Sequence, residues 1–288
     1  YGLVGSEMCI RDSQMGWVLA QEEHNRGSSD PIVARTVMQA GKIVPLYEFS
    51  KDKEQGIIDV FEKLRRHLHQ CDDLSHKIVN EIKEKTEELE NYLAENKQQS
   101  TIHLPAAENL TNDVETYLYH AKLSFRELKD LFFFTLDKKF KPTTQYNHIA
   151  DWAEKRFSEN NSLSRWLRQN CVWIQKVIDS RNAVEHPESH TLVIRNFHVE
   201  NGGIIRPPSW SLDGEPPHAI LKDMEILTTN ILEFSEILLL YCLRNIKDIY
   251  PIIIAEIPLK NRNPDVPVRF IATLEQDIDE NGMYKCKN

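Results

Sequence analysis

The feature that most constrains the fold is a long amphipathic stripe in the first third of the chain. Between residues 57 and 93, apolar side chains recur at intervals that place them on one face of an α-helix. The members of this stripe are Ile57, Val60, Phe61, Leu64, Leu68, Cys71, Ile78, Ile82, Leu89 and Leu93. An apolar face of this length must be buried against other elements, so the stripe predicts one long helix, straight or kinked.

Further periodic segments predict helices over residues 109–136, 144–157, 162–186 and 216–247. Residues 191–199 and 204–210 alternate on either side of an Asn-Gly-Gly turn, which predicts a β-hairpin over residues 191–210. The proline-containing segment after residue 250 predicts edge strands. The fold class is therefore mainly α, a helical bundle with an inserted β-hairpin and a short β-rich C-terminal tail.

A polar run at residues 96–105, NKQQSTIHLP, is the best linker candidate in the chain. It separates an N-terminal segment, residues 15–100, which contains the long helix, from a helical bundle over residues 101–250. Residues 251–288 then form the β-rich tail.

The first residues have an origin unrelated to the fold. Residues 3–13, LVGSEMCIRDS, back-translate to a DNA sequence that looks like a transposon-based sequencing-library adapter. We therefore expect residues 1–14 to be an adapter-derived artefact, and Met15 is a candidate start.

A cluster of chemically active side chains lies at the end of the helix predicted for residues 162–186. Arg181 continues the apolar stripe of that helix, and a guanidinium on a packing face needs an anion, a carboxylate partner or a water-lined cleft. Pro187 ends the helix at Glu185 or His186, which lets His186 turn back toward Arg181. An Arg can hold a phosphate, the Asn182 amide can orient it, and a His can move protons near neutral pH. This set suits chemistry on a phosphodiester.

The segment Arg181 to His186 resembles the Arg, polar residue, three residues, His signature of the HEPN superfamily. These are small helical-bundle proteins whose active members are ribonucleases of toxin–antitoxin, abortive-infection and other defence systems. The resemblance covers these six residues and the helical setting of roughly residues 110–247. It implies a HEPN-like bundle with Arg181, Asn182 and His186 as the catalytic set and Glu185 beside them. It also implies metal-independent RNA cleavage by attack of the ribose 2′-OH, in a homodimer.

The charge of the chain limits how RNA can be held. A net charge of −9 argues against a broad basic surface, so RNA must meet a local cluster of cations. The candidates lie on the helix at 162–186 and just beyond it, and they are Arg165, Arg168, Lys176, Arg195 and Arg206. The alternative is that these side chains form an ordinary solvated helix face.

Several other kinds of protein are disfavoured by the sequence. The five cysteines have no paired spacing, which indicates a reducing compartment, and we expect the protein in the cytoplasm. No Gly-rich phosphate loop and no metal-ligand spacing occurs, so we expect neither a cofactor nor a catalytic metal. The apolar stretch at residues 226–246 contains Asn230, Glu233 and Glu236, which disfavours a membrane span. The expected partners are RNA, a second copy of the chain and an antitoxin or other regulatory protein, with no membrane.

A rival function from another class remains open. Many HEPN members are inactive, so the chain is alternatively a catalytically silent helical interaction or nucleotide-binding module. In that case Arg181 pairs with a carboxylate such as Asp179 or Glu185, and His186 caps the helix end. The direction of Arg181 discriminates the two, because an enzyme needs it at a solvent cleft beside His186 and a module holds it in a buried ion pair.

Overall fold

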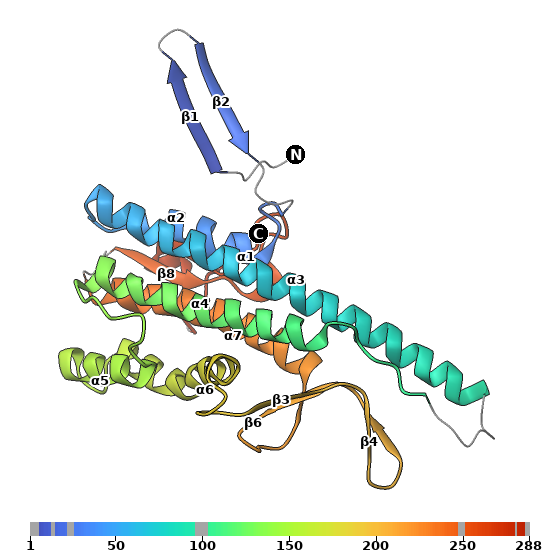
Figure 1. Ribbon diagram of the computed structural model, residues 1–288. Helices are drawn as coiled ribbons and strands as arrows, with labels where there is room; N and C mark the ends of the chain where they lie inside the picture. Colours follow the sequence, from blue (N-terminus) through green and yellow to red (C-terminus); the bar gives the residue numbers. More distant parts are fainter. Residues whose placement is uncertain are drawn as a thin grey trace.

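The computed structural model in Figure 1 shows a mainly helical protein with small separate sheets. It describes the backbone of residues 6–12 and 15–21, and backbone and side chains of residues 26–95, 103–246, 251–279 and 281–285. Strands β1 (Ser6–Asp12) and β2 (Met15–Gln21) pair antiparallel. Residues 1–14 are expected to be an adapter-derived artefact, and of these residues the structure describes only the backbone of β1.

The stripe at residues 57–93 forms helix α3 (Lys51–Glu95), which packs against α4 (Leu110–Leu136) (Figure 1). Ion pairs between the two helices show that they run antiparallel, since the residue numbers on α3 decrease along the series of pairs while those on α4 increase. Lys77 Nζ lies 2.7 Å from Asp113 Oδ2, and Lys63 Nζ lies 3.5 Å from Glu127 Oε2. Lys53 Nζ lies 2.6 Å from Asp137 Oδ1, just past the end of α4.

Helices α4 and α7 (Ile220–Arg244) form the middle layer of the bundle. Helix α3 covers them on one side, while α6 (Ser162–Glu185) packs on them from the other and carries α5 (Tyr146–Phe157) (Figure 1). All five helices share one hydrophobic core. The division expected at residue 100 is therefore not a boundary in the packing, because the α3 stripe is buried against helices that follow it.

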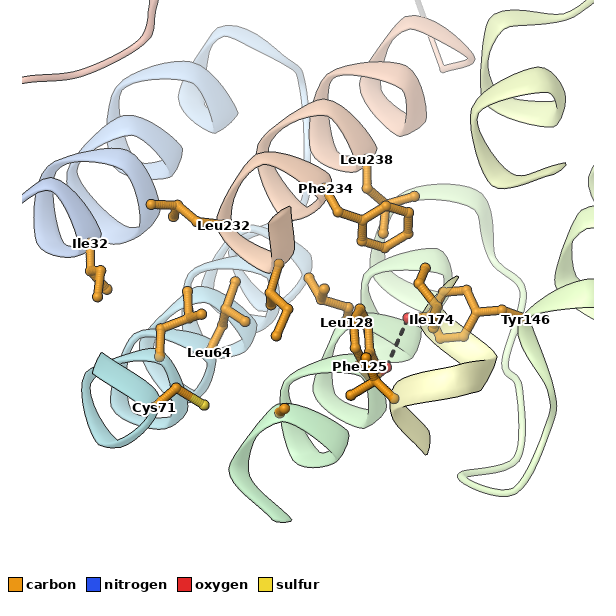
Figure 2. Packing of buried hydrophobic residues seen from close by; sticks show 14 of the residues in the cluster. Ile32, Leu64, Cys71, Phe125, Leu128, Tyr146, Ile174, Leu232, Phe234 and Leu238 are labelled. Atoms are coloured by element: carbon orange, nitrogen blue, oxygen red, sulfur yellow. Dashed lines mark hydrogen bonds between the residues drawn. The ribbon is translucent and has the colours of Figure 1, made fainter. Parts of the chain in front are cut away.

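Aromatic side chains from several helices meet in this core, and Figure 2 shows Phe125, Tyr146 and Phe234. Phe125 of α4 meets Tyr146, Trp173 and Phe234 edge to face, at centroid distances of 5.9, 5.5 and 6.1 Å. The Tyr146 hydroxyl donates to the Phe125 carbonyl oxygen at 2.8 Å, the dashed line in Figure 2. These rings fix how α4, α5, α6 and α7 meet, because edge-to-face aromatic pairs favour a defined geometry.

The predicted β-hairpin forms over residues 192–212, as two separate ladders. Strand β3 (Leu192–Arg195) pairs with β6 (Ser209–Leu212), and β4 (His198–Glu200) pairs with β5 (Ile204–Arg206). The two ladders keep one register, since each strand advances three residues from the pair of Arg195 and Ser209 to the pair of His198 and Arg206. Pro207 and Pro208 lie at the interruption, where a proline cannot donate to the ladder.

Helix α7 begins later than the sequence predicted. His218 and Ala219 form β7 (His218–Ala219), which pairs with β6, so the helix starts at Ile220 rather than at Pro216. Among the described residues, α7 is the helix whose length and composition would suffice to cross a membrane. Since 61% of its most apolar stretch is buried inside the protein, its place in the core accounts for its composition.

A short helical segment that the sequence analysis missed precedes α3. It comprises α1 (Pro31–Val33), the π-helical turn η1 (Ala34–Met38), α2 (Gln39–Ile43) and the 3₁₀ turn η2 (Val44–Leu46). Asp30 caps it, because its Oδ1 accepts hydrogen bonds from the backbone of Ile32 and Val33 at 2.7 and 3.1 Å. The segment packs on α3 and α7.

The C-terminal tail returns to that segment. Its strands β8 (Ile252–Glu256) and β9 (Phe270–Leu274) pair antiparallel, and 3₁₀ turns η3 (Leu259–Asn261) and η4 (Glu275–Asp277) follow each strand. The backbone N–H groups of Arg269 and Phe270 donate to Gln39 Oε1 at 2.9 and 2.8 Å. The β-rich tail expected from the sequence thus packs against the first helices of the chain.

A buried carboxylate joins these three parts. Glu236 of α7 is fully buried and accepts hydrogen bonds from Arg35 Nε at 3.0 Å and Gln39 Nε2 at 3.1 Å. Arg269 Nη1 lies 3.7 Å from its Oε2. Burial raises the pKa of Glu236, and the guanidinium groups of Arg35 and Arg269 oppose that rise.

Replacing Glu236 with Ala should destabilise the protein by about 3–5 kcal/mol, because it leaves the Arg35 guanidinium without its buried counter-charge and removes one of the carboxylates around Arg269. The matched control is Glu233→Ala on the same helix. Glu233 lies 3.5 Å from Arg269 but is 47% exposed, so its loss should cost no more than about 1 kcal/mol. Urea denaturation measures both, and equal losses would contradict the structural role of Glu236.

Candidate functional site

The end of α6 presents the residues that the sequence singled out. The helix begins at an N-cap formed by Asn161. The Asn161 Oδ1 accepts the Leu163 N–H at 2.9 Å. It ends at Glu185, and His186 is the C-cap, as Pro187 predicts. The His186 imidazole is 63% exposed, with Glu188 Oε1 3.8 Å from its Nδ1.

A cleft of about 410 Å³ opens beside this helix end. Its walls are the C-terminal half of α6, one face of α4 and the loop at residues 142–145 that leads into α5. From α6, the predicted residues Asn182, Glu185 and His186 line it. The structure therefore brings these three side chains to one concave surface.

The opposite wall carries cations that the sequence analysis missed. Lys122, Arg126 and Lys129 of α4 all line the cleft, because positions spaced by four and three residues share one helix face. That spacing was visible in the sequence, but it falls within a helix whose apolar and aromatic residues dominate the pattern. The three side chains form a local positive cluster in an acidic protein.

Lys129 is the most deeply placed of these cations, with only 5% of its surface exposed. Its Nζ donates to the Pro142 carbonyl oxygen at 2.6 Å and lies 5.6 Å from the centre of the Tyr146 ring. Burial, together with the positive charges of Arg126 and Lys122, lowers the pKa of Lys129 to about 8. Its charge is therefore sensitive to mildly alkaline pH.

Lys122 links the two walls of the cleft. Its Nζ donates to Asn182 Oδ1 at 2.9 Å and to Glu185 Oε2 at 2.6 Å. The hydrogen bond from Lys122 lowers the pKa of Glu185, although partial burial opposes this. Glu185 is thus held as a carboxylate between cations, since its Oε1 also lies 3.5 Å from Arg181 Nη2.

Arg181 lies beside the cleft, and it is not among the residues that line it. Its side chain is 17% exposed, and its guanidinium lies over the Tyr119 ring of α4, 5.6 Å from the ring centre. Its Nε is buried without a hydrogen-bond partner among the described residues. Arg181 thus does not point into solvent beside His186. It also does not form an ion pair in the core, because its carboxylate neighbour, Glu185, is exposed at the rim of the cleft.

The predicted RNA contacts of the first half of α6 face away from the cleft. Arg168 forms a fork with two acidic residues of α5, with Nη2 2.6 Å from Asp151 Oδ1 and Nε 2.8 Å from Glu154 Oε1. These hydrogen bonds raise the pKa of Arg168 and hold α5 to α6. Asp151 and Glu154 lie on α5, so the sequence of α6 alone did not reveal them.

The other predicted contacts are dispersed. Lys176 pairs with Glu215, and Arg206 pairs with Glu200 across the hairpin at 2.8 Å. Arg165 and Arg195 are exposed on α6 and β3. None of these lines the cleft, and Lys176 lines a different pocket.

That second pocket, of about 220 Å³, lies between α6, α7 and β6 and is mostly apolar. The indole N–H groups of Trp173 and Trp210 in its wall are already bonded to Asn170 and Asp223, at 2.7 and 2.6 Å. Among the residues with described side chains, no group of three or more His, Cys, Asp and Glu side chains could hold a metal ion. The α4–α6 cleft is therefore the stronger candidate for polar chemistry.

Comparisons of the chain with protein-family models, with curated proteins and with solved structures yield no match. The resemblance to the HEPN superfamily thus rests on residues 181–186 and their helical setting.

Anion binding in the cleft should depend on the charge of Lys129. Because the pKa of Lys129 is about 8, the affinity for a short oligodeoxyribonucleotide should fall as the pH rises through about 8. Lys129→Met should remove this step and weaken binding at pH 7, whereas Lys155→Met, at an exposed lysine of α5, should keep it. Fluorescence anisotropy from pH 7 to 9 measures the effect, and a wild-type affinity that is constant over this range would rule it out.

Proposed function

We propose that this chain is a metal-independent endoribonuclease of a toxin–antitoxin or phage-defence type, acting at the α4–α6 cleft. One observation supports this most, the placing of three α4 cations opposite the His186 end of α6. The cluster supplies local positive charge in a chain of net charge −9. A cytoplasmic location and an antitoxin or other regulatory partner belong to the same proposal.

Glu185 indicates where the phosphate would lie. Its two oxygens face Lys122 and Arg181, which are the groups that a phosphate oxygen would approach. In the proposed complex, the scissile phosphate replaces Glu185 as the anion between these two cations. Arg181 then contacts substrate without leaving its place on Tyr119.

The reaction follows from the groups around that position. The ribose 2′-OH loses its proton and attacks phosphorus, and the 5′-oxygen leaves and takes up a proton. His186 is exposed, lines the cleft and exchanges one of these protons as a general acid or base. Lys122 and Arg126 offset the charge that develops on the phosphate oxygens, and Asn182 orients Lys122.

A second candidate is binding without cleavage, as a helical interaction or nucleotide-binding module. It is favoured by the environment of Arg181, whose Nε is buried and whose guanidinium packs on Tyr119. In that case the ion pairs of Glu185 are structural contacts between α4 and α6. The two candidates differ in whether RNA is cut, so a cleavage assay separates them.

The test of the enzyme is His186→Ala. This change should abolish cleavage of single-stranded RNA and leave the melting temperature nearly unchanged, because the side chain is exposed and contributes little packing. His148→Ala on α5 is the matched control, since His148 is also 63% exposed and should keep full activity. Cleavage should persist in EDTA and yield a 2′,3′-cyclic phosphate and a 5′-OH.

Two outcomes would count against the enzyme. Wild-type protein that binds RNA without cutting it would favour the silent module. Activity that is lost in EDTA and restored by magnesium would show that a metal ion, rather than His186 and the cations, carries the chemistry.

The proposed enzyme is a symmetric homodimer with the two α6 ends adjacent. The reaction needs proton abstraction, protonation of the leaving group and stabilisation of the phosphate charge, and a single Arg181 and a single His186 are few groups for these three tasks. A second copy of the chain would supply a second Arg181 and a second His186. Arg181→Ala and His186→Ala chains, each inactive alone, should regain part of the activity when mixed, because the mixed dimer retains one of each residue. Light scattering gives the oligomeric state. A monomer with full specific activity on dilution would exclude the composite site.

A further inference from the structure

Two histidines face each other across the antiparallel pair of α3 and α4. His67 Nδ1 and His120 Nδ1 are 3.2 Å apart, and the ring centroids are 5.4 Å apart with an interplanar angle of 40°. Both residues are partly buried, so water can still reach them. His69 lies on another face of α3 and approaches Asp30.

The separation of the two nitrogens matches that of two ligands on one metal ion. Imidazole nitrogens bind Zn²⁺ at about 2.0–2.1 Å, so two of them on a tetrahedral ion lie about 3.3 Å apart. The observed 3.2 Å differs little from that value, and the helices need not move. An ion would take the place of the proton between the two Nδ1 atoms. That proton would move to Nε2 of its own ring, so each neutral ring would carry its single proton on Nε2.

Burial affects the protonation of both rings. Burial, followed by the neighbouring His120 and the charges of Arg126 and Arg66, lowers the pKa of His67 to about 4. Burial also lowers the pKa of His120. A lowered pKa favours the neutral imidazole, which is the ligand form of histidine.

The surrounding charge is mixed. Arg66 and Arg126 disfavour a cation near His67, whereas the carboxylate of Glu127 favours one. Glu127 is 9% exposed and is shared between Lys63 and Arg126, at 3.5 and 3.0 Å. The described residues offer no group of three ligands, so solvent would complete the coordination.

We propose that His67 and His120 form a binding site for a first-row divalent metal ion that prefers imidazole ligands, most of all Zn²⁺. The ion would bridge α3 and α4. Two protein ligands and open water positions distinguish the site from a closed structural zinc site. The His120 ring packs edge to face on the Tyr119 ring, with a centroid distance of 5.3 Å and an interplanar angle of 78°. The Arg181 guanidinium lies over the same Tyr119 ring. The ion would thus be separated from the proposed ribonuclease site by the Tyr119 ring, and it would take no part in the chemistry there.

The test is titration of the untagged full chain with Zn²⁺. Isothermal calorimetry measures the binding, and thermal unfolding measures its effect on stability. One ion per chain should bind, and the melting temperature should rise with Zn²⁺ concentration, because the ion joins two helices in the folded state only. His67→Ala and His120→Ala should each weaken this binding at least tenfold and remove the thermal shift. His76→Ala, at an exposed histidine of the same helix, should change neither.

A second measurement covers the case in which an alanine variant fails to fold. Electron paramagnetic resonance of wild-type protein loaded with one equivalent of Cu²⁺ should show coupling to two imidazole nitrogens. Coupling to fewer than two nitrogens, or Zn²⁺ binding that persists undiminished in His67→Ala and His120→Ala, would overturn the proposal. RNA cleavage is a separate readout, so the metal site and the proposed function can fail independently.

Discussion

The antiparallel packing of α3 on α4 is the contact on which the rest of the structure depends. It buries the apolar stripe of α3, and it fixes the rotation of α4 through cross-helix ion pairs such as that of Lys77 and Asp113. With α4 fixed in this way, Phe125 faces the aromatic core, while Lys122, Arg126 and Lys129 face the cleft. One helix thus supplies both the centre of the core and the charged wall of the candidate site.

The parts of the fold that the sequence predicted are those encoded by local signals. The periodicity of residues 57–93 gave α3, Pro187 gave the end of α6, and Asn-Gly-Gly gave the turn of the hairpin. The helical segment at 31–46 was missed, because it is short and is divided among α-helical, π-helical and 3₁₀ turns, with a glycine and a proline near its end. It packs on α3 and α7 and is bonded to Glu236 and Arg269, about two hundred residues away.

The candidate site was predicted only on its α6 side. Asn182, Glu185 and His186 follow from the helix end. Lys122, the partner of Asn182 and Glu185, is 60 residues from Asn182, and sequence spacing gives no sign of that contact. The predicted RNA contacts of α6 rest on the charge of the side chains alone. Arg168 shows why charge is insufficient to predict an RNA contact, because acidic residues of α5 already pair with it. The function proposed for the cleft depends on whether a phosphate can take the position that Glu185 occupies.

A crystal structure with an oligoribonucleotide that carries a 2′-O-methyl group at the cleavage position tests this claim most directly, because the blocked 2′-oxygen prevents cleavage. The account predicts a phosphate in the α4–α6 cleft, with its oxygens on Lys122 and Arg181, Glu185 displaced, and His186 within hydrogen-bond reach of the blocked oxygen or of the 5′-oxygen. RNA bound elsewhere, with the contact between Lys122 and Glu185 intact, would contradict it.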